Sequence, residues 1–171
     1  MKIRSLIFIQ ILFPALVFAD VPAGYSKVAR EYSIPEILLY SVALQESEKP
    51  GTGRPWPWTI NVGGKGIYFD SRTELFKYAE KLIERGITNF DIGLMQVNWR
   101  WNGQHFRSLW AATEPYTNLR TGAMIIRKYY RESRSYEVAI GKYHAPSNPE
   151  NAKKYKELVR NKLALLVDGE R

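Results

Sequence analysis

The chain has 171 residues, a length that suits one compact domain, and 45% of them are apolar, which excludes a disordered chain. It contains no cysteine, which excludes a disulfide scaffold and thiol catalysis, and its two histidines are too few for a multi-histidine zinc site. We expect neither a metal nor another cofactor. The formal net charge of +8 favours an acidic partner surface, but the basic residues are scattered, so we expect no nucleic-acid partner.

The first 19 residues have the pattern of a secretory signal peptide. Lys2 and Arg4 precede an apolar run that is too short, and too interrupted by Pro14, to make a good membrane span. Cleavage is expected after Ala19, with an uncleaved anchor as the alternative. We therefore expect an exported protein, periplasmic or associated with a cell wall, whose mature domain covers residues 20–171 and has no stable membrane span.

The mature chain has the pattern of helices around one irregular insert. Ser33 and Glu36 have the spacing of a capping box, and the helix that they would open is apolar on most sides, which predicts a buried central helix. The sequence Lys-Pro-Gly at 49–51 ends this helix, so Glu46 falls in its last turn. The insert, residues 50–70, contains two β-prone runs around a Gly-rich turn, which predicts a small hairpin.

A second capping box, formed by Ser71 and Glu74, predicts a helix that ends at Gly86. Further helices are expected after Asp91 and over residues 116–131, 136–143 and 149–166. The predicted fold class is mainly α, an α+β arrangement of one helical domain with a small β-hairpin insert.

Glu46 is the first candidate for chemistry. Its apolar neighbours exclude water, and the negative end of the helix dipole disfavours a carboxylate, so both effects should raise its pKa. A carboxylic acid that keeps its proton near neutral pH can protonate the leaving oxygen in glycoside cleavage. The alternative is a surface glutamate at a frayed helix end.

A second motif, Gly-Leu-Met-Gln at residues 93–96, follows downstream. Together with Glu46 and Ser47, this motif resembles the paired motifs of the lytic transglycosylases, a family of the lysozyme-like superfamily. The resemblance implies a lysozyme-like domain in which the glutamate is the sole acid and base and the second motif helps to shape the site. It implies substrate-binding roles for Ser47, Gly93, Met95 and Gln96.

A third segment, residues 139–145, resembles the Ala-x-x-Tyr-Asn segment of the same family, which implies that Tyr143 lies beside Glu46. His144 stands where the family usually has asparagine. The insert adds three aromatic residues that either bind a sugar face or pack against the domain: Trp56, Trp58 and Tyr68. We expect one sugar platform at most among them and include Tyr68 with the substrate-binding candidates.

The separation between Glu46 and Gly93 is longer than in common members of the family, because the insert and the helix near 71–84 lie between them. In this respect the chain resembles the transglycosylases that accompany conjugation and type IV secretion. That resemblance implies peptidoglycan glycan strands as substrate, local opening of the wall, and proteins of a secretion or conjugation machine as partners. We expect a monomer.

The family resemblance implies cleavage between N-acetylmuramic acid and N-acetylglucosamine without water. Glu46 would protonate the bridging oxygen and then accept a proton from the muramoyl primary hydroxyl, so that an anhydro ring closes. Two alternatives stay open. One is a hydrolytic lysozyme assisted by Asp91, although we interpret Asp91 first as the cap of the helix that follows it. The other is a module that binds peptidoglycan without cutting it.

Overall fold

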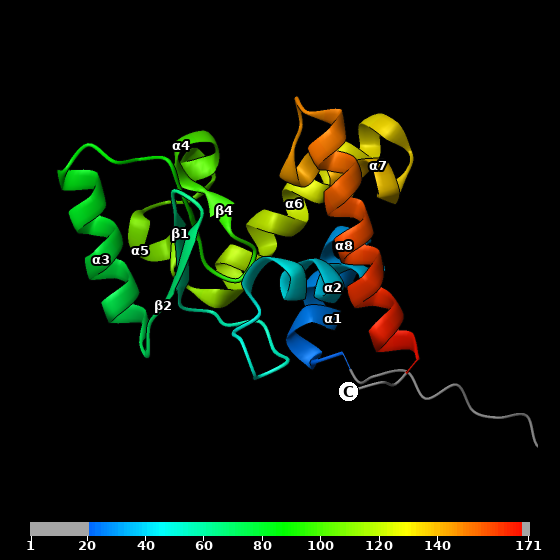
Figure 1. The fold of residues 1–171 in the computed structure, drawn as a ribbon, viewed down its shortest axis with the longest axis horizontal. Coiled ribbons are helices and arrows are strands. Elements are labelled where there is room, and N and C mark those ends of the chain that lie inside the picture. Colours follow the sequence, from blue (N-terminus) through cyan, green and yellow to red (C-terminus); the bar gives the residue numbers. More distant parts are fainter. Residues whose placement is uncertain (1–20, 169–171) are drawn as a thin grey trace, which may run out of the picture.

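The computed structural model describes residues 21–168, which form a mainly helical domain with a small antiparallel sheet (Figure 1). This confirms the predicted fold class. The predicted signal peptide lies outside the described residues. Within residues 21–168, no helix combines the length and the apolar character needed to cross a membrane.

The described residues form helices and short strands in the following order along the chain. The helices are α1 (Ala23–Tyr32), α2 (Glu36–Ser47), α3 (Arg72–Glu84), α4 (Trp99–Asn102), the 3-10 helix η1 (Gly103–His105), α5 (Leu109–Ala112), α6 (Pro115–Ser133), α7 (Tyr136–His144) and α8 (Pro149–Val167). The strands are β1 (Thr59–Val62), β2 (Lys65–Tyr68), β3 (Phe90–Ile92) and β4 (Val97–Asn98).

The central helix, α2, is buried around most of its circumference, as its apolar sequence predicts. It packs against α1 and α8, and its last residue is Ser47, which confirms that Glu46 lies in the last turn. The predicted capping box at Ser33 is wrong. Ser33 has a φ of 51° and ends α1, where its N–H bonds the carbonyls of the last turn, and α2 begins after Pro35.

The sheet has the strand order β2-β1-β3-β4. The predicted hairpin is present as β1 and β2, with Thr59 opposite Tyr68, but it makes up only half of the sheet. β3 pairs with the other edge of β1, so that Ile60 lies opposite Ile92, and β4 pairs with β3. The sequence did not predict these two strands because they are only three and two residues long.

The helix predicted to follow Asp91 starts later than expected. Asp91 lies in β3, and the chain then makes a tight turn in which Gly93 and Gln96 have φ values of 81° and 42°. Left-handed backbone cannot continue into a right-handed helix, so α4 begins only at Trp99, with Asn98 as its cap.

The helices α3, α6, α7 and α8 follow the prediction closely, whereas α1, η1 and α5 were not predicted. Ser71 caps α3 by accepting a hydrogen bond from the Glu74 N–H at 3.2 Å, and Gly86 ends that segment with a φ of 74°. The bounds of α6, α7 and α8 lie within two residues of those expected.

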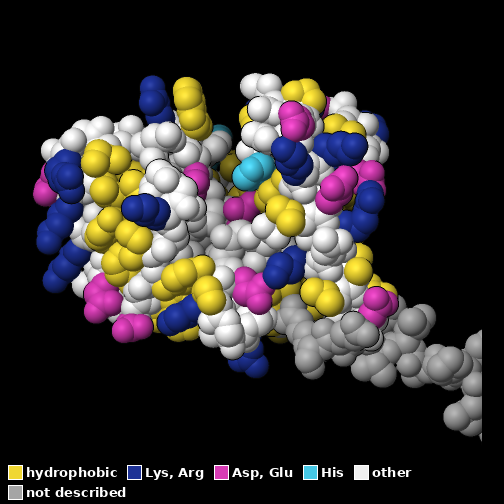
Figure 2. Space-filling view, viewed as in Figure 1, with side chains coloured by type: hydrophobic (Ala, Val, Ile, Leu, Met, Phe, Trp, Pro, Cys, Tyr) yellow, Lys and Arg dark blue, Asp and Glu magenta, His cyan; other side chains and the backbone are white. Residues whose placement is uncertain are grey.

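The elements form two lobes (Figure 1). One lobe contains the sheet with α3, α4 and α5, and the other contains α1, α2, α7 and α8. α6 connects them, because it packs against α5 in the first lobe and against α1 and α7 in the second. The space-filling view is hollowed between the lobes (Figure 2).

Candidate active site

Glu46 lies at the end of α2, where the two lobes meet, and is only partly exposed. Its carboxylate accepts a hydrogen bond from the hydroxyl of Tyr155, a buried residue of α8. His144, the last residue of α7, stacks on Tyr155 with ring centroids 4.4 Å apart and an angle of 3° between the rings. Helices from one lobe thus form one wall around the carboxyl group.

The environment of Glu46 favours its protonated form. The pKa of this carboxyl group is raised to about 8: burial raises it most, the hydrogen bond from Tyr155 lowers it, and the negative charge of Asp91 raises it by a smaller amount. Burial is the largest of these effects, as the sequence predicted for a glutamate among apolar neighbours. At neutral pH the group therefore holds a proton that it can donate.

Asp91 lies on β3, in the lobe opposite Glu46, and is half-buried. Its carboxylate accepts a hydrogen bond of 2.8 Å from the Asn98 side chain. Burial raises the pKa of Asp91, and its charge acts on both Glu46 and His144. The interpretation of Asp91 as a helix cap is therefore wrong, because Asn98 caps α4 and Asp91 belongs to the sheet.

Ser47 joins the two lobes rather than presenting a free hydroxyl. Its Oγ lies 2.7 Å from the carbonyl oxygen of Leu94 and 3.0 Å from that of Ala43, and the side chain is buried. The turn formed by residues 93–96 is therefore fixed against the end of the helix that carries Glu46.

Gly93 and Met95 pack this turn tightly against α6. A Cβ on Gly93 would lie 2.5 Å from the side chain of Asn118, which is fully buried. Asn118 accepts a 2.8 Å bond from the Met95 N–H and donates to the carbonyls of Ile92 and Ala112. Met95 itself is fully buried, so Gly93 and Met95 act through packing inside the protein.

The remaining candidates also make contacts within the protein. Tyr143 donates a hydrogen bond to the carbonyl of Met95, and burial together with the charge of Glu46 raises its pKa. Gln96 donates through its amide nitrogen to the Gly93 carbonyl at 2.8 Å. Tyr68 donates to the carbonyl of Glu48 at 3.0 Å, so it joins β2 to the end of α2.

Sequence reasoning did not identify Tyr155 as the partner of Glu46. The two residues are 109 positions apart, and Tyr155 stands in an amphipathic stretch that predicts only a packed helix. Glu48, close to Glu46 in sequence, forms an ion pair with Lys162 of α8 and so has a separate, structural partner.

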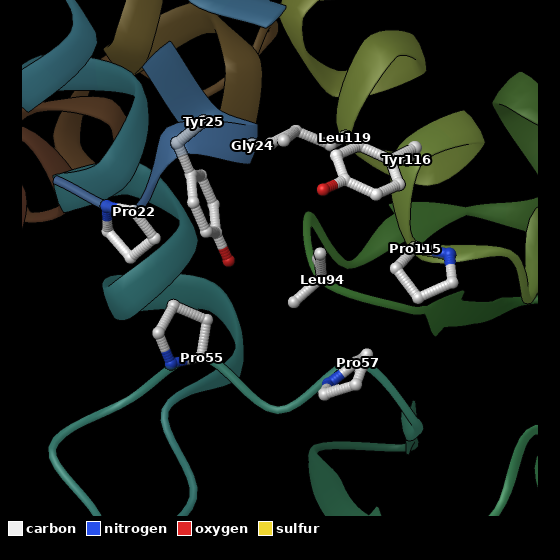
Figure 3. Close-up of a pocket in the computed structure, with 9 residues that line it drawn as sticks. All are labelled: Pro22, Gly24, Tyr25, Pro55, Pro57, Leu94, Pro115, Tyr116 and Leu119. Atoms are coloured by element: carbon white, nitrogen blue, oxygen red, sulfur yellow. The ribbon is translucent and has the colours of Figure 1, made fainter. Parts of the chain in front are cut away.

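A second hollow, of about 260 Å³, lies where α1, α6 and the 55–57 loop approach the turn at Leu94 (Figure 3). Its lining is mostly apolar, with prolines from three segments, and its polar groups are the hydroxyls of Tyr25 and Tyr116. Because it contains no carboxylic acid, it does not compete with Glu46 as a reaction centre. Among the described residues, no group of three His, Asp or Glu side chains could hold a metal ion.

Comparison with known proteins gave no match to a family model, to a curated protein or to a solved structure.

Proposed function

We propose that this protein is a peptidoglycan lytic transglycosylase that cleaves the bond between N-acetylmuramic acid and N-acetylglucosamine with Glu46 as its single acid and base. The observation that carries the proposal is a carboxyl group that stays protonated at neutral pH, because burial raises its pKa to about 8, at the junction of two lobes. The order of the motifs at Glu46, Gly93 and Tyr143 supports the same assignment.

In the first step, the protonated Glu46 donates its proton to the bridging oxygen, and the bond from that oxygen to the muramoyl anomeric carbon breaks. The N-acetyl group of the substrate shields the positive charge that develops on the sugar. The hydrogen bond from Tyr155 stabilises the carboxylate that remains on Glu46.

In the second step, the Glu46 carboxylate takes the proton of the muramoyl primary hydroxyl, and the oxygen of that hydroxyl bonds to the anomeric carbon. The product is an anhydro-muramoyl end, and Glu46 has recovered its proton. No water is consumed, so the site needs no second carboxylate to activate one.

A hydrolytic lysozyme is the second candidate, and the position of Asp91 favours it. Two carboxyl groups whose environments differ are the usual pair for glycoside hydrolysis, and the charge of Asp91 reaches Glu46. In that case Asp91 would activate a water molecule after Glu46 had protonated the leaving oxygen. The two reactions give different products, which mass spectrometry separates.

The proposal includes export to the periplasm or cell wall and local wall opening for a secretion or conjugation machine. Its support is the resemblance to the conjugation-associated transglycosylases, the pattern of the first 19 residues and the basic charge of the chain. A glycan-binding module without activity is the third reading of the same site.

The test compares two conservative variants, Glu46→Gln and Glu48→Gln, in clearing a suspension of purified peptidoglycan. Glu46→Gln removes the proton donor, so we expect lysis to fall at least about a hundredfold. Glu48→Gln changes a neighbouring carboxylate whose partner is Lys162, and it should keep its activity. Lysis by a folded Glu46→Gln protein at the wild-type rate would exclude Glu46 as the acid.

A further inference from the structure

Trp101 is the most exposed large hydrophobic residue of the described chain, with 66% of its surface accessible. Trp99, two residues earlier, has the opposite environment, because it stacks on Phe90 and Phe106 within the lobe. The core therefore accounts for one tryptophan of α4 and leaves the indole of the other in solvent. A single exposed apolar side chain is ordinary on a protein surface, so a binding role for this indole depends on where it lies and what surrounds it.

The backbone of Trp101 is held by side chains on both sides. Its N–H donates to Asn98 Oδ1 at 3.2 Å, and its carbonyl accepts a hydrogen bond from Gln104 Nε2 at 3.0 Å. The guanidinium of Arg100 lies 5.1 Å from the centre of the indole ring, within the range of a cation–π contact. The exposed ring therefore projects from a fixed turn and carries a cation beside it.

This turn is connected directly to the candidate active site. Asn98 pairs with Asp91 across β3 and β4 and donates a 2.8 Å hydrogen bond to the Asp91 carboxylate, while its Oδ1 accepts the N–H of Trp101. α4 lies at the edge of the lobe that faces α7 (Figure 1). Hydrophobic and basic side chains project beside the hollow from this part of the surface (Figure 2).

We propose that Trp101 and Arg100 form an outer binding site for the peptidoglycan strand, in which the indole stacks on a sugar ring remote from the scissile bond and the guanidinium binds a carboxylate of a peptide stem. The identity of this ligand rests on the proposed function. A glycan strand bound at Glu46 extends beyond the site on both sides of the bond that is cut. Trp101 offers a flat aromatic face that suits the C–H bonds of a sugar ring, and Arg100 offers a fork of N–H donors that suits a carboxylate.

Trp110 provides a matched control within the same lobe. It is 42% exposed and also has an arginine over its ring, since the guanidinium of Arg72 lies 3.9 Å from the ring centre. Its surroundings differ, because it packs edge-on against Phe76 of α3, and Arg72 also bonds its carbonyl. This tryptophan belongs to the packing of α3 against α5, away from Asn98 and Asp91.

The experiment measures binding to purified peptidoglycan by co-sedimentation, in a Glu46→Gln background so that no substrate is cut. Trp101→Ala should weaken binding about tenfold, the loss expected for one well-formed aromatic contact. Trp101→Phe should recover part of the affinity because it keeps an aromatic face, and Trp110→Ala should bind as the parent does. Thermal unfolding of each variant shows whether its fold is intact.

Glycan strands from which an amidase has removed the peptides separate the sugar contact of Trp101 from the carboxylate contact of Arg100. Arg100→Gln should weaken binding to peptide-bearing wall and leave binding to the stripped strands unchanged, whereas Trp101→Ala should weaken both. Unchanged binding of Trp101→Ala, or equal losses in Trp101→Ala and Trp110→Ala, would overturn the proposal. The binding result and the activity result can fail separately. If the wild-type protein cuts the wall but Trp101→Ala binds it normally, the outer site is excluded and the proposed activity stands. If binding depends on Trp101 but the wild-type protein never cuts the wall, the proposed activity is excluded and the outer site stands.

Discussion

The carboxyl group of Glu46 is under two opposed influences. Burial disfavours its charge and raises its pKa to about 8, whereas the hydroxyl of Tyr155 stabilises the charged form. An acid that must first give a proton and then accept one benefits from both, because neither form is far lower in free energy than the other near neutral pH. The hydrogen bond from Tyr155 thus offsets part of the effect of burial.

Replacing Tyr155 with Phe should change the pH dependence of cleavage in a defined direction. The wild-type protein should lose activity as the pH rises through about 8, because Glu46 then loses the proton that it donates. Without the hydrogen bond, the pKa of Glu46 rises, so the fall in kcat/KM should move to higher pH. Tyr143→Phe serves as the control, since that hydroxyl bonds the Met95 carbonyl. If kcat/KM of Tyr155→Phe falls at the same pH as in the wild-type protein, or at a lower pH, Tyr155 does not lower the pKa of Glu46.

The same pKa shift predicts that Glu46 destabilises the fold at neutral pH. A carboxyl group with a folded pKa of about 8 and an ordinary value of 4.5 keeps a proton that the unfolded chain releases, so stability decreases as the pH rises through that interval. Glu46→Gln removes the titration and should be more stable than wild type by on the order of 2–3 kcal/mol near pH 7, with little difference at pH 4. Urea denaturation at several pH values measures this, and a difference that is independent of pH would count against a raised pKa.

For single residues, the sequence predicted the properties that depend on residues nearby in the chain. The last turn of an apolar helix was enough to place Glu46 and to predict the direction of its pKa shift. Tyr155 could not be predicted, because its contact with Glu46 depends on how α8 packs against α2. The side chains of Gln96 and Tyr68 bond the carbonyls of Thr59 and Glu48, which lie in other segments of the chain, and no spacing rule shows these contacts.

Among the elements, the turn at residues 93–96 makes contacts with the largest number of helices around the candidate site. Ser47 holds it from α2, Tyr143 from α7 and Asn118 from α6, so three helices converge on four residues. Gly93 permits this convergence, because it has a φ of 81° and leaves no room for a Cβ beside Asn118.

Gly93→Ala should therefore be far more damaging than an ordinary glycine substitution. Its Cβ would lie 2.5 Å from a buried side chain in a left-handed backbone, so we expect a loss of at least about 3 kcal/mol in the free energy of unfolding. Gly63→Ala is the matched control: Gly63 has a φ of 59° but no atom within 4 Å of its Cβ position, so the cost should be about 1 kcal/mol. Equal losses in the two variants, measured by chemical denaturation, would mean that packing against Asn118 contributes nothing.

Local sequence patterns predicted the elements unevenly for a physical reason. Ser71 and Ser33 both precede a glutamate by three positions, yet Ser71 begins a helix and Ser33 ends one. The difference lies in the residues before them, because α1 packs against α2 and α6 and reaches Ser33. A capping box describes four residues, whereas the end of a preceding helix depends on the packing of the whole segment.

In the whole molecule, two lobes lie side by side, and α6 holds them together because it packs against α5 in one and against α1 and α7 in the other. The Ser47 contact with Leu94 crosses this boundary, as does the bond from Tyr143 to Met95. Periodicity and turn residues predicted the class of fold and the presence of a hairpin. They did not predict the second half of the sheet, because β3 and β4 are specified by pairing with strands elsewhere in the chain.

Under the proposed function, Asp91 is the residue whose role differs between transglycosylation and hydrolysis. In both proposed reactions Glu46 would first donate a proton, and the reactions would differ in whether the muramoyl hydroxyl or a water molecule completes them. Asp91 has no proton to transfer in the first reaction and acts as the base in the second. The chemical ends of the released fragments therefore identify the reaction.

The most direct measurement is mass spectrometry of the fragments released when the mature protein digests purified peptidoglycan. The wild-type protein and Asp91→Asn should release fragments with anhydro-muramoyl ends, and Glu46→Gln should release none. Reducing ends that carry an added water, lost in Asp91→Asn, would contradict the proposed transglycosylase activity and would identify the protein as a lysozyme with Asp91 as its base.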